Sequence, residues 1–175
     1  MALSENRAFR HQSGTYRTAS QSDYARALYI GSGSSPADVR TRPKIAIISA
    51  TDDSTAGHVH LDRLAQIVKS AIYEAGAEGY ISNIPAGCDG VAQGRGMHWS
   101  LLSRDLGAAA VEAKVQMHQF DAMVCISSCD KITPAMLMAC ARIDIPTVFI
   151  TGGLMATCGL SAIPGRTRLG TSDIK

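Results

Sequence analysis

The feature that most constrains the fold is an alternation of short apolar runs with stretches of helical periodicity. The first run, residues 44–50, is almost continuously apolar, which is typical of a strand buried on both faces. Apolar residues then follow helical spacing over 58–75, and Gly76 is placed to end that helix. The cycle repeats, with further strands expected at 79–84, 121–127 and 145–151 and helices at about 99–118 and 133–142. This order predicts an α/β fold: a three-layer parallel sheet flanked by helices, with right-handed crossovers.

Residues 1–42 differ in character from the rest of the chain. They are polar and include a Gly-Ser-Gly-Ser-Ser-Pro run at 31–36, so we expect an irregular N-terminal arm with one short helix near 22–29. Residues 43–175 are expected to form the α/β domain. At the start of the helix expected from about 133, Thr133 is a good N-cap residue and Pro134 a good first helical residue.

Composition excludes several classes of protein. The chain has 175 residues, of which 46% are hydrophobic and 18% charged, with a net charge of +2, so bulk charge gives no indication of nucleic-acid or membrane-surface binding. No apolar run approaches the roughly 20 residues of a membrane span, and no apolar secretory signal stands at the N-terminus. Five cysteines without a secretion signal favour free thiols or metal ligands over disulfides.

The expected location is the cytoplasm. The arm carries Arg7, Arg10 and Arg17 among several serines and threonines, a composition shared with organellar transit peptides, although Glu5 argues against that interpretation. The mitochondrial matrix is therefore kept as the alternative.

Loops that follow parallel strands emerge at one edge of a sheet, where open α/β folds bind ligands. The four such loops expected here are 51–57, 85–97, 128–133 and 152–159. Cys88 and Asp89 lie in the second loop, and Cys129, Asp130 and Lys131 lie in the third. We expect these two groups to face one another across adjacent strand ends.

Thiolates can ligate iron, and carboxylates suit hard cations such as Mg²⁺. The two Cys-Asp pairs could therefore hold a soft and a hard metal centre in one site, and the alternative is that they are ordinary loop thiols. Cys125 and Cys140 fall within predicted elements and are expected to be core residues. His58 and His60 are expected to start a helix and not to chelate a metal. The glycines of the 85–97 loop either bind an anion at the following helix or only shape a turn.

Several motifs together resemble one known family, the dihydroxy-acid dehydratases and phosphogluconate dehydratases, over about residues 16–160. The matching stretches occur in family order: AGHVHL at 56–61, CDGVAQG at 88–94, SLLSR at 100–104, CDKITP at 129–134, MLMA at 136–139 and GG at 152–153. The first Cys-Asp motif is closer to the sugar-acid branch of that family and the second to the dihydroxy-acid branch.

The resemblance implies a hydro-lyase that converts a 2,3-dihydroxy carboxylate to a 2-keto acid with an iron–sulfur cluster, 2Fe–2S or 4Fe–4S, and Mg²⁺. By position, Cys129 matches a cluster ligand, as does Cys88 in the sugar-acid branch. Asp89 and Asp130 match magnesium ligands, and Lys131 matches a catalytic lysine that can become a carbamate and bind magnesium. The resemblance also implies a small hydroxy-acid substrate, a role in branched-chain amino-acid biosynthesis or sugar-acid metabolism, and a homo-oligomer, as a dimer, or a complementary C-terminal chain as partner.

The chain departs from the family pattern in three positions and in length. Some members have a cluster cysteine where Ala56 stands, and Ala135 and Leu154 replace the usual glycine and proline of two motifs near the site. Family chains are several times longer, and their later part holds a further cluster cysteine, another magnesium ligand and the proton-abstracting base. We therefore expect an N-terminal fragment or split subunit that is inactive by itself. The alternatives are a non-catalytic binding or interaction protein with the same fold, or a small-anion-binding module.

Overall fold

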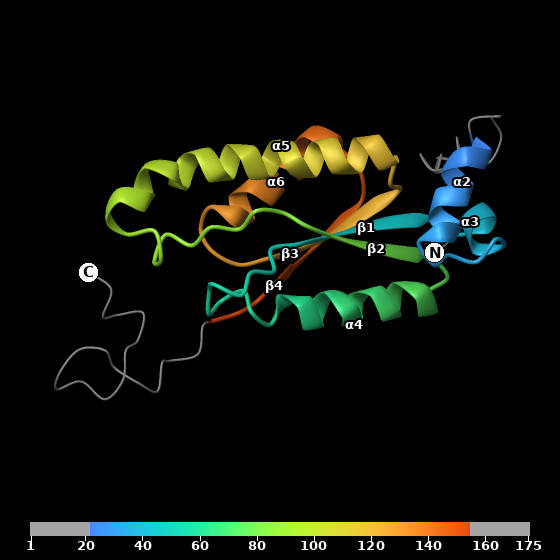
Figure 1. Ribbon diagram of the computed structural model, residues 1–175, viewed down its shortest axis with the longest axis horizontal. Helices are drawn as coiled ribbons and strands as arrows, with labels where there is room; N and C mark the ends of the chain where they lie inside the picture. The colour runs from blue at the N-terminus through green and yellow to red at the C-terminus, as the bar shows by residue number, and fades with distance from the viewer. Residues whose placement is uncertain (1–21, 155–175) are drawn as a thin grey trace, which may run out of the picture.

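The computed structural model of the chain describes residues 22–154 and shows one sheet of four parallel strands (Figure 1). The strands are β1 (Lys44–Ser49), β2 (Glu78–Asn83), β3 (Ala122–Ser127) and β4 (Thr147–Thr151), in the spatial order β2-β1-β3-β4. The predicted α/β class and parallel sheet are confirmed. Arg7, Arg10, Arg17 and Cys158 lie outside the described residues.

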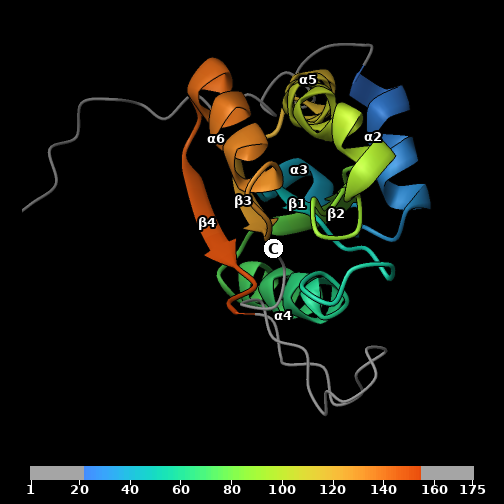
Figure 2. The same cartoon turned by 90° about the vertical axis from the view of Figure 1, so that its left-hand side faces the viewer.

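Helices cover both faces of the sheet and give the expected three layers. Helix α4 (Leu61–Glu74) lies on one face, and α5 (Ser100–His118) and α6 (Ile132–Ile143) lie together on the other (Figures 1 and 2). The short helices α2 (Ser22–Gly31) and α3 (Asp38–Thr41) precede β1 at the amino-terminal edge of the strands. None of the helices in residues 22–154 is long and apolar enough to cross a membrane.

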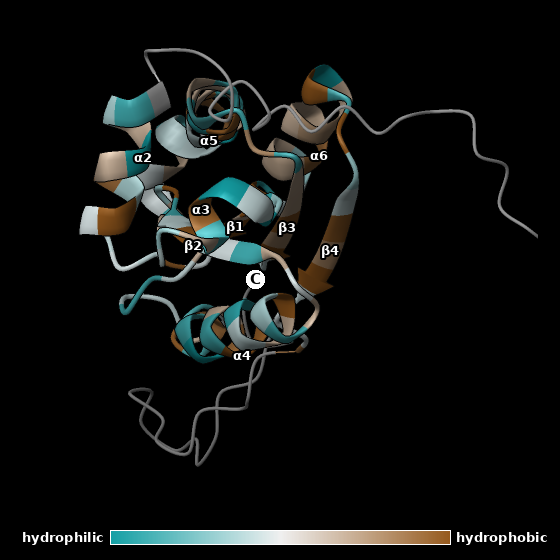
Figure 3. Ribbon diagram, turned by 90° about the vertical axis from the view of Figure 1, so that its right-hand side faces the viewer, coloured by the Kyte–Doolittle hydropathy of each residue, from teal (hydrophilic) through white to brown (hydrophobic). Residues whose placement is uncertain are grey.

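Burial explains why the strand sequences are apolar without alternation. β1 lies between β2 and β3 and is covered by helices on both faces, so Ala46, Ile47 and Ile48 are all fully buried. Hydropathy follows the same layering, since β3 and β4 are largely hydrophobic whereas α4 carries many hydrophilic residues (Figure 3). The core therefore sits around β1 and β3 and holds their carboxyl ends in fixed positions.

The end of α4 follows the sequence prediction. Gly76 has a φ of 88°, its N–H donates to the carbonyl of Tyr73 at 3.0 Å, and the N–H of Ala77 donates to that of Ile72 at 3.1 Å. This is the hydrogen-bond pattern of a Schellman motif, which needs a left-handed residue at the position of Gly76. The motif turns the chain directly into β2.

The start of α6 differs from the prediction. The helix begins at Ile132 with Lys131 as its N-cap residue, so the assignments of Thr133 as the N-cap and of Pro134 as the first helical residue are wrong. The chain turns at Cys129, whose φ is 67°, and the N–H of Thr133 already donates to the carbonyl of Cys129 at 3.3 Å. The hydroxyl of Thr133 instead donates to the hydroxyl of Ser127 at 3.1 Å, which ties the first helical turn to the end of β3.

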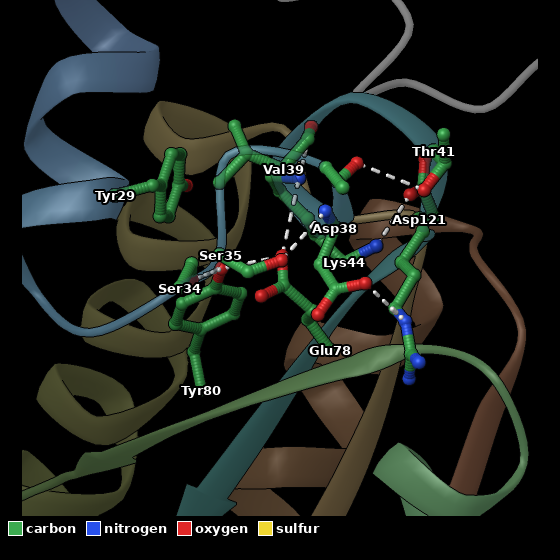
Figure 4. A network of polar contacts seen from close by, with 12 residues as sticks. Tyr29, Ser34, Ser35, Asp38, Val39, Thr41, Lys44, Glu78, Tyr80 and Asp121 are labelled. Atoms are coloured by element: carbon green, nitrogen blue, oxygen red, sulfur yellow. Dashed lines mark hydrogen bonds and ion pairs between the residues drawn. The ribbon is translucent and has the colours of Figure 1, made fainter.

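A buried polar network joins the amino-terminal ends of the strands (Figure 4). The Lys44 ammonium donates to the carbonyl of Val39 at 3.1 Å and lies 3.7 Å from a carboxylate oxygen of Glu78. The hydroxyl of Tyr80 donates to that carboxylate at 2.9 Å, and burial raises the pKa of Tyr80. The carboxylate of Asp121 accepts from the backbone N–H of Lys44 at 2.8 Å. The network holds β1, β2 and the start of β3 together at the edge opposite the candidate site.

Candidate functional site

The candidate site lies at the carboxyl edge of the sheet. Because β1 sits between β2 and β3, the Cys88 and Cys129 loops do not follow adjacent strands, and that part of the sequence prediction is wrong. The connections from β1 and from β3 run to opposite sides of the sheet, so the β1–β3 boundary is the point where strand order reverses. In open parallel sheets, ligands bind outside the strand ends at such a point.

The loop after β2 nevertheless reaches the loop after β3. The ammonium of Lys131 donates to Oδ2 of Asp89 at 2.9 Å and to Oδ2 of Asp130 at 2.7 Å. The hydroxyl of Ser100, the first residue of α5, donates to Oδ1 of Asp89 at 2.7 Å. One positive charge is therefore shared by two carboxylates that come from different loops.

The charges of these groups reinforce one another. The hydrogen bonds from Lys131 and Ser100 hold the pKa of Asp89 below its usual range. Asp130 and Asp89, in that order, raise the pKa of Lys131. Both shifts favour the charged forms of Asp89 and Lys131 near neutral pH.

The two loop thiols lie at the same edge. Cys88 and Cys129 are both free and half-buried. Burial raises the pKa of the Cys129 thiol to about 12, with further contributions from Cys88, Asp130 and Asp89. A thiol with a pKa raised in this way is neutral near neutral pH, and metal binding requires its thiolate form.

The other two cysteines of the described residues are packed in the interior. Cys125 is fully buried in β3, and Cys140 of α6 is partly buried against the same core. Burial, with a smaller contribution from Cys140, raises the pKa of Cys125 to about 12. Both fit the predicted role of small apolar side chains.

His58 is the residue that the sequence interpretation missed. It precedes α4, as expected, but its side chain is fully buried, and its Nε2 lies 3.1 Å from Sγ of Cys129. Its Nδ1 is buried without a hydrogen-bond partner in the part of the chain that the structure describes. His60 instead contacts the carbonyl oxygen of Gly152 at 2.9 Å, so the two histidines do not share a ligand. The only sequence signal was a histidine in the loop after the first buried strand.

A small cavity of about 290 Å³ opens beside Cys129, between the ends of β3 and β4. Its wall includes small hydroxyl-bearing and glycine residues: Ser127, Ser128, Thr133, Thr151, Gly152 and Gly153. Hydroxyl and backbone groups of this kind suit a small polar ligand.

The donor set fits part of a metal site. Within residues 22–154, no group of three or more His, Cys, Asp or Glu side chains is arranged to hold a metal ion. The donors instead occur as pairs, and the carboxylates of Asp89 and Asp130 already share a cation, the Lys131 ammonium. Oxygen donors of this kind suit Mg²⁺, and the thiols Cys88 and Cys129 suit iron. Each metal would need further ligands from outside the described residues or from solvent.

The structure thus has a parallel α/β sheet with thiols, carboxylates and an amine gathered at its carboxyl edge. The family model described as dihydroxy-acid/6-phosphogluconate dehydratase N-terminal matches residues 42–174. The chain therefore belongs to the dihydroxy-acid/6-phosphogluconate dehydratase family, as its motifs indicated, and corresponds to the N-terminal domain of that family.

Individual relatives agree with the family assignment. The chain is 46% identical over 131 residues to a dihydroxy-acid dehydratase of Caldicellulosiruptor saccharolyticus, a match that covers 74% of this chain and 24% of the relative. A protein of the same name from Akkermansia muciniphila is 45% identical over 132 residues, 75% of this chain and 24% of that protein. One from Bifidobacterium longum subsp. infantis is 48% identical over 132 residues, 75% of this chain and 21% of that protein. The matched part thus spans about a quarter of the length of these curated relatives.

Proposed function

We propose that the chain forms one wall of the active site of a hydro-lyase that dehydrates a 2,3-dihydroxy carboxylate to a 2-keto acid. The observation that carries this proposal is the convergence of two loops, in which Lys131 lies between the carboxylates of Asp89 and Asp130. The names of the relatives favour a dihydroxy acid of branched-chain amino-acid biosynthesis over a sugar acid as substrate.

Asp89 and Asp130 are the residues that would hold Mg²⁺, at the position that the Lys131 ammonium now neutralises. A dication beside that ammonium would be repelled by it. Lys131 must then swing away or lose its charge. If the free amine adds to CO₂, an N–C bond forms and the nitrogen loses a proton, which leaves an anionic carbamate able to bind the cation.

Cys129 and Cys88 are the residues that would hold the iron–sulfur cluster. When bound, the cluster and Mg²⁺ supply Lewis acidity that makes departure of hydroxide feasible near neutral pH. The protein's part is to present the thiol sulfurs from two loops and to enclose the substrate next to the small cavity at Cys129.

We propose that the remaining metal ligands and the proton-abstracting base come from a sequence equivalent to the later part of the longer relatives, in the same chain or in a complementary one. We also propose that the assembly is homo-oligomeric. The bacterial relatives are consistent with a cytoplasmic location, which stays a prediction, and no comparison supports the mitochondrial alternative. A non-catalytic binding protein with this fold is the rival function.

Anaerobic reconstitution with iron and sulfide tests the enzyme proposal. The visible spectrum and the iron content are recorded for the chain alone and together with a sequence equivalent to the later part of a relative. We expect stoichiometric cluster formation and dehydratase activity in the combined sample. Absence of a cluster in both samples would reject the enzyme proposal in favour of the rival.

Cys129→Ser is the matched variant for that experiment. The exchange replaces a sulfur by an oxygen of similar size in a half-buried loop, so we expect the free energy of unfolding to change by less than about 1 kcal/mol. Iron content should fall to background while the circular dichroism spectrum stays the same. Unfolding of the variant would show that the thiol is structural.

A further inference from the structure

His58 has a position that its place before a helix does not explain. It lies between β1 and α4, its side chain is fully buried, and Nε2 is 3.1 Å from Sγ of Cys129. Its own backbone N–H donates to the carbonyl of Thr55 at 2.8 Å, which fixes the loop locally. The imidazole is thus held at the β1–β3 boundary and directed at the sulfur.

The hydrogen bonds available to the ring indicate which nitrogen carries the proton. With the proton on Nδ1, a buried N–H would have no acceptor in residues 22–154, and Nε2 would face only a weak S–H donor. With the proton on Nε2, the N–H points at the sulfur, and Nδ1 keeps only an unused lone pair. The geometry therefore places the proton on Nε2, directed at the sulfur.

Cys129 is a sulfur that needs such a donor. The nearby Lys131 ammonium donates to the two carboxylates. Metal binding requires the thiolate, which the imidazole N–H can stabilise by a direct hydrogen bond.

We infer that His58 is a positioning residue for Cys129: its Nε2–H donates to the sulfur and thereby orients and stabilises the thiolate that binds metal. This inference rests on the proposed metal site. Partners that orient metal ligands typically contribute about 10- to 100-fold in metal affinity, and hydrogen bonds to cluster sulfurs also set the reduction potential.

Cobalt(II) is a suitable probe because thiolate–cobalt charge-transfer absorption reports the sulfur bond directly. The metal-free chain is titrated anaerobically as wild type, His58→Leu and His58→Gln. We expect His58→Leu to weaken cobalt binding at least tenfold. His58→Gln should recover most of the affinity, because the glutamine amide can place an N–H close to the position of Nε2. Equal affinity of the wild type and His58→Leu would overturn the inference.

Alkylation of Cys129 separates failure of the inference from failure of the metal site. If the wild-type chain binds no cobalt, the loop thiols do not hold a metal without further ligands, and the hydrogen bond is still tested with iodoacetamide. Rates are measured for each thiol by mass spectrometry, with Cys88 as the internal reference. We expect His58→Leu to slow alkylation of Cys129 about tenfold relative to Cys88 and His58→Gln to restore it. An unchanged or faster rate would overturn the inference.

His60→Leu is the matched control, because His60 contacts the Gly152 carbonyl and not the sulfur. It should leave both cobalt affinity and Cys129 alkylation unchanged. If His58→Leu fails to fold by circular dichroism, His58→Asn takes its place, since its shorter amide should not reach the sulfur. His58→Asn should then show the weaker cobalt binding and slower Cys129 alkylation expected for His58→Leu. Cobalt affinity and alkylation rate equal to those of the wild type would overturn the inference. After cluster reconstitution, loss of the donor should also make the reduction potential more negative.

Discussion

Gly152, in the loop after β4, contacts the segment that follows β1. A Cβ atom added there would come within 2.8 Å of Cδ2 of Leu61 and 3.2 Å of Nε2 of His60. Leu61 is fully buried and cannot easily move away. The backbone carbonyl of Gly152 also accepts the contact from His60, so both loops depend on the absence of a side chain here.

We expect Gly152→Ala to lower the free energy of unfolding by about 1–3 kcal/mol, through overpacking against Leu61. Urea denaturation followed by circular dichroism measures the change. Gly87→Ala is the matched control, because a Cβ there meets no atom within 4 Å, and its effect should stay within about 0.5 kcal/mol. A Gly152 variant as stable as the control would show that the two loops separate readily.

Asp89 gives a prediction for acid stability. Its pKa is lowered in the folded state, so its contribution to stability is present above the unfolded value of about 3.9 and is lost as pH falls through the folded value. Asp89→Asn should therefore reduce the loss of unfolding free energy between pH 7 and pH 3. Urea denaturation at the two pH values measures this difference. Asp53→Asn, at an exposed position, is the control. If the free energy of unfolding falls as much between pH 7 and pH 3 in Asp89→Asn as in this control, the ion pair of Asp89 is contradicted.

At the scale of elements, the amino-terminal ends of β1 and β2 are joined by a buried ion pair. The side chains of Lys44 and Glu78 are only 2% and 8% exposed, and Tyr80 donates to the same carboxylate (Figure 4). Buried pairs of this kind contribute little net stability, but loss of one partner leaves an uncompensated charge. The pair therefore serves mainly to fix how the two strand ends meet.

We expect Glu78→Ala to lower the free energy of unfolding by about 3–5 kcal/mol, because it removes the Glu78 carboxylate that lies beside the buried Lys44 ammonium. The double variant Lys44→Met with Glu78→Leu should be clearly more stable than the single variant. Urea denaturation of the wild type and both variants makes the comparison. A double variant no more stable than Glu78→Ala would contradict the penalty expected for the remaining buried charge.

At the scale of the whole molecule, a group of large apolar side chains is exposed near the site. Trp99, Leu102 and Leu106 are 66%, 52% and 55% exposed, and their spacing places them on one face of the segment that ends in α5. Apolar groups gathered in this way typically mark an interaction surface. The proposed oligomer or complementary chain would need an apolar contact surface of this kind.

We expect the chain to self-associate through this surface at high concentration. Leu102→Glu with Leu106→Glu should shift the sedimentation coefficient towards that of a monomer. Both positions are more than half exposed, so the folded state should lose less than about 1 kcal/mol. The exposed Leu28→Glu on α2 serves as control. Association that persists in the double variant would place the contact elsewhere.

The sequence by itself determined the elements and the chemistry available to the site. The continuous apolar run of β1 is typical of a strand buried on both faces, and Gly76 ends α4 because a residue that tolerates positive φ is needed there. The order of strands and helices also placed Asp89, Asp130 and Lys131 at one edge of a parallel sheet. Their roles in catalysis, and the metals they would bind, stay predictions.

The tertiary structure decided which of these groups meet. Strand order is set by the packing of helices on both faces, and no local pattern shows that β1 separates β2 from β3. The turn at Cys129 likewise moved the start of α6 ahead of Thr133, whose hydroxyl then bonded to Ser127. The contact of His58 with Cys129 depends on the same strand order, since it joins residues that are far apart in the chain and adjacent only where β1 and β3 end side by side.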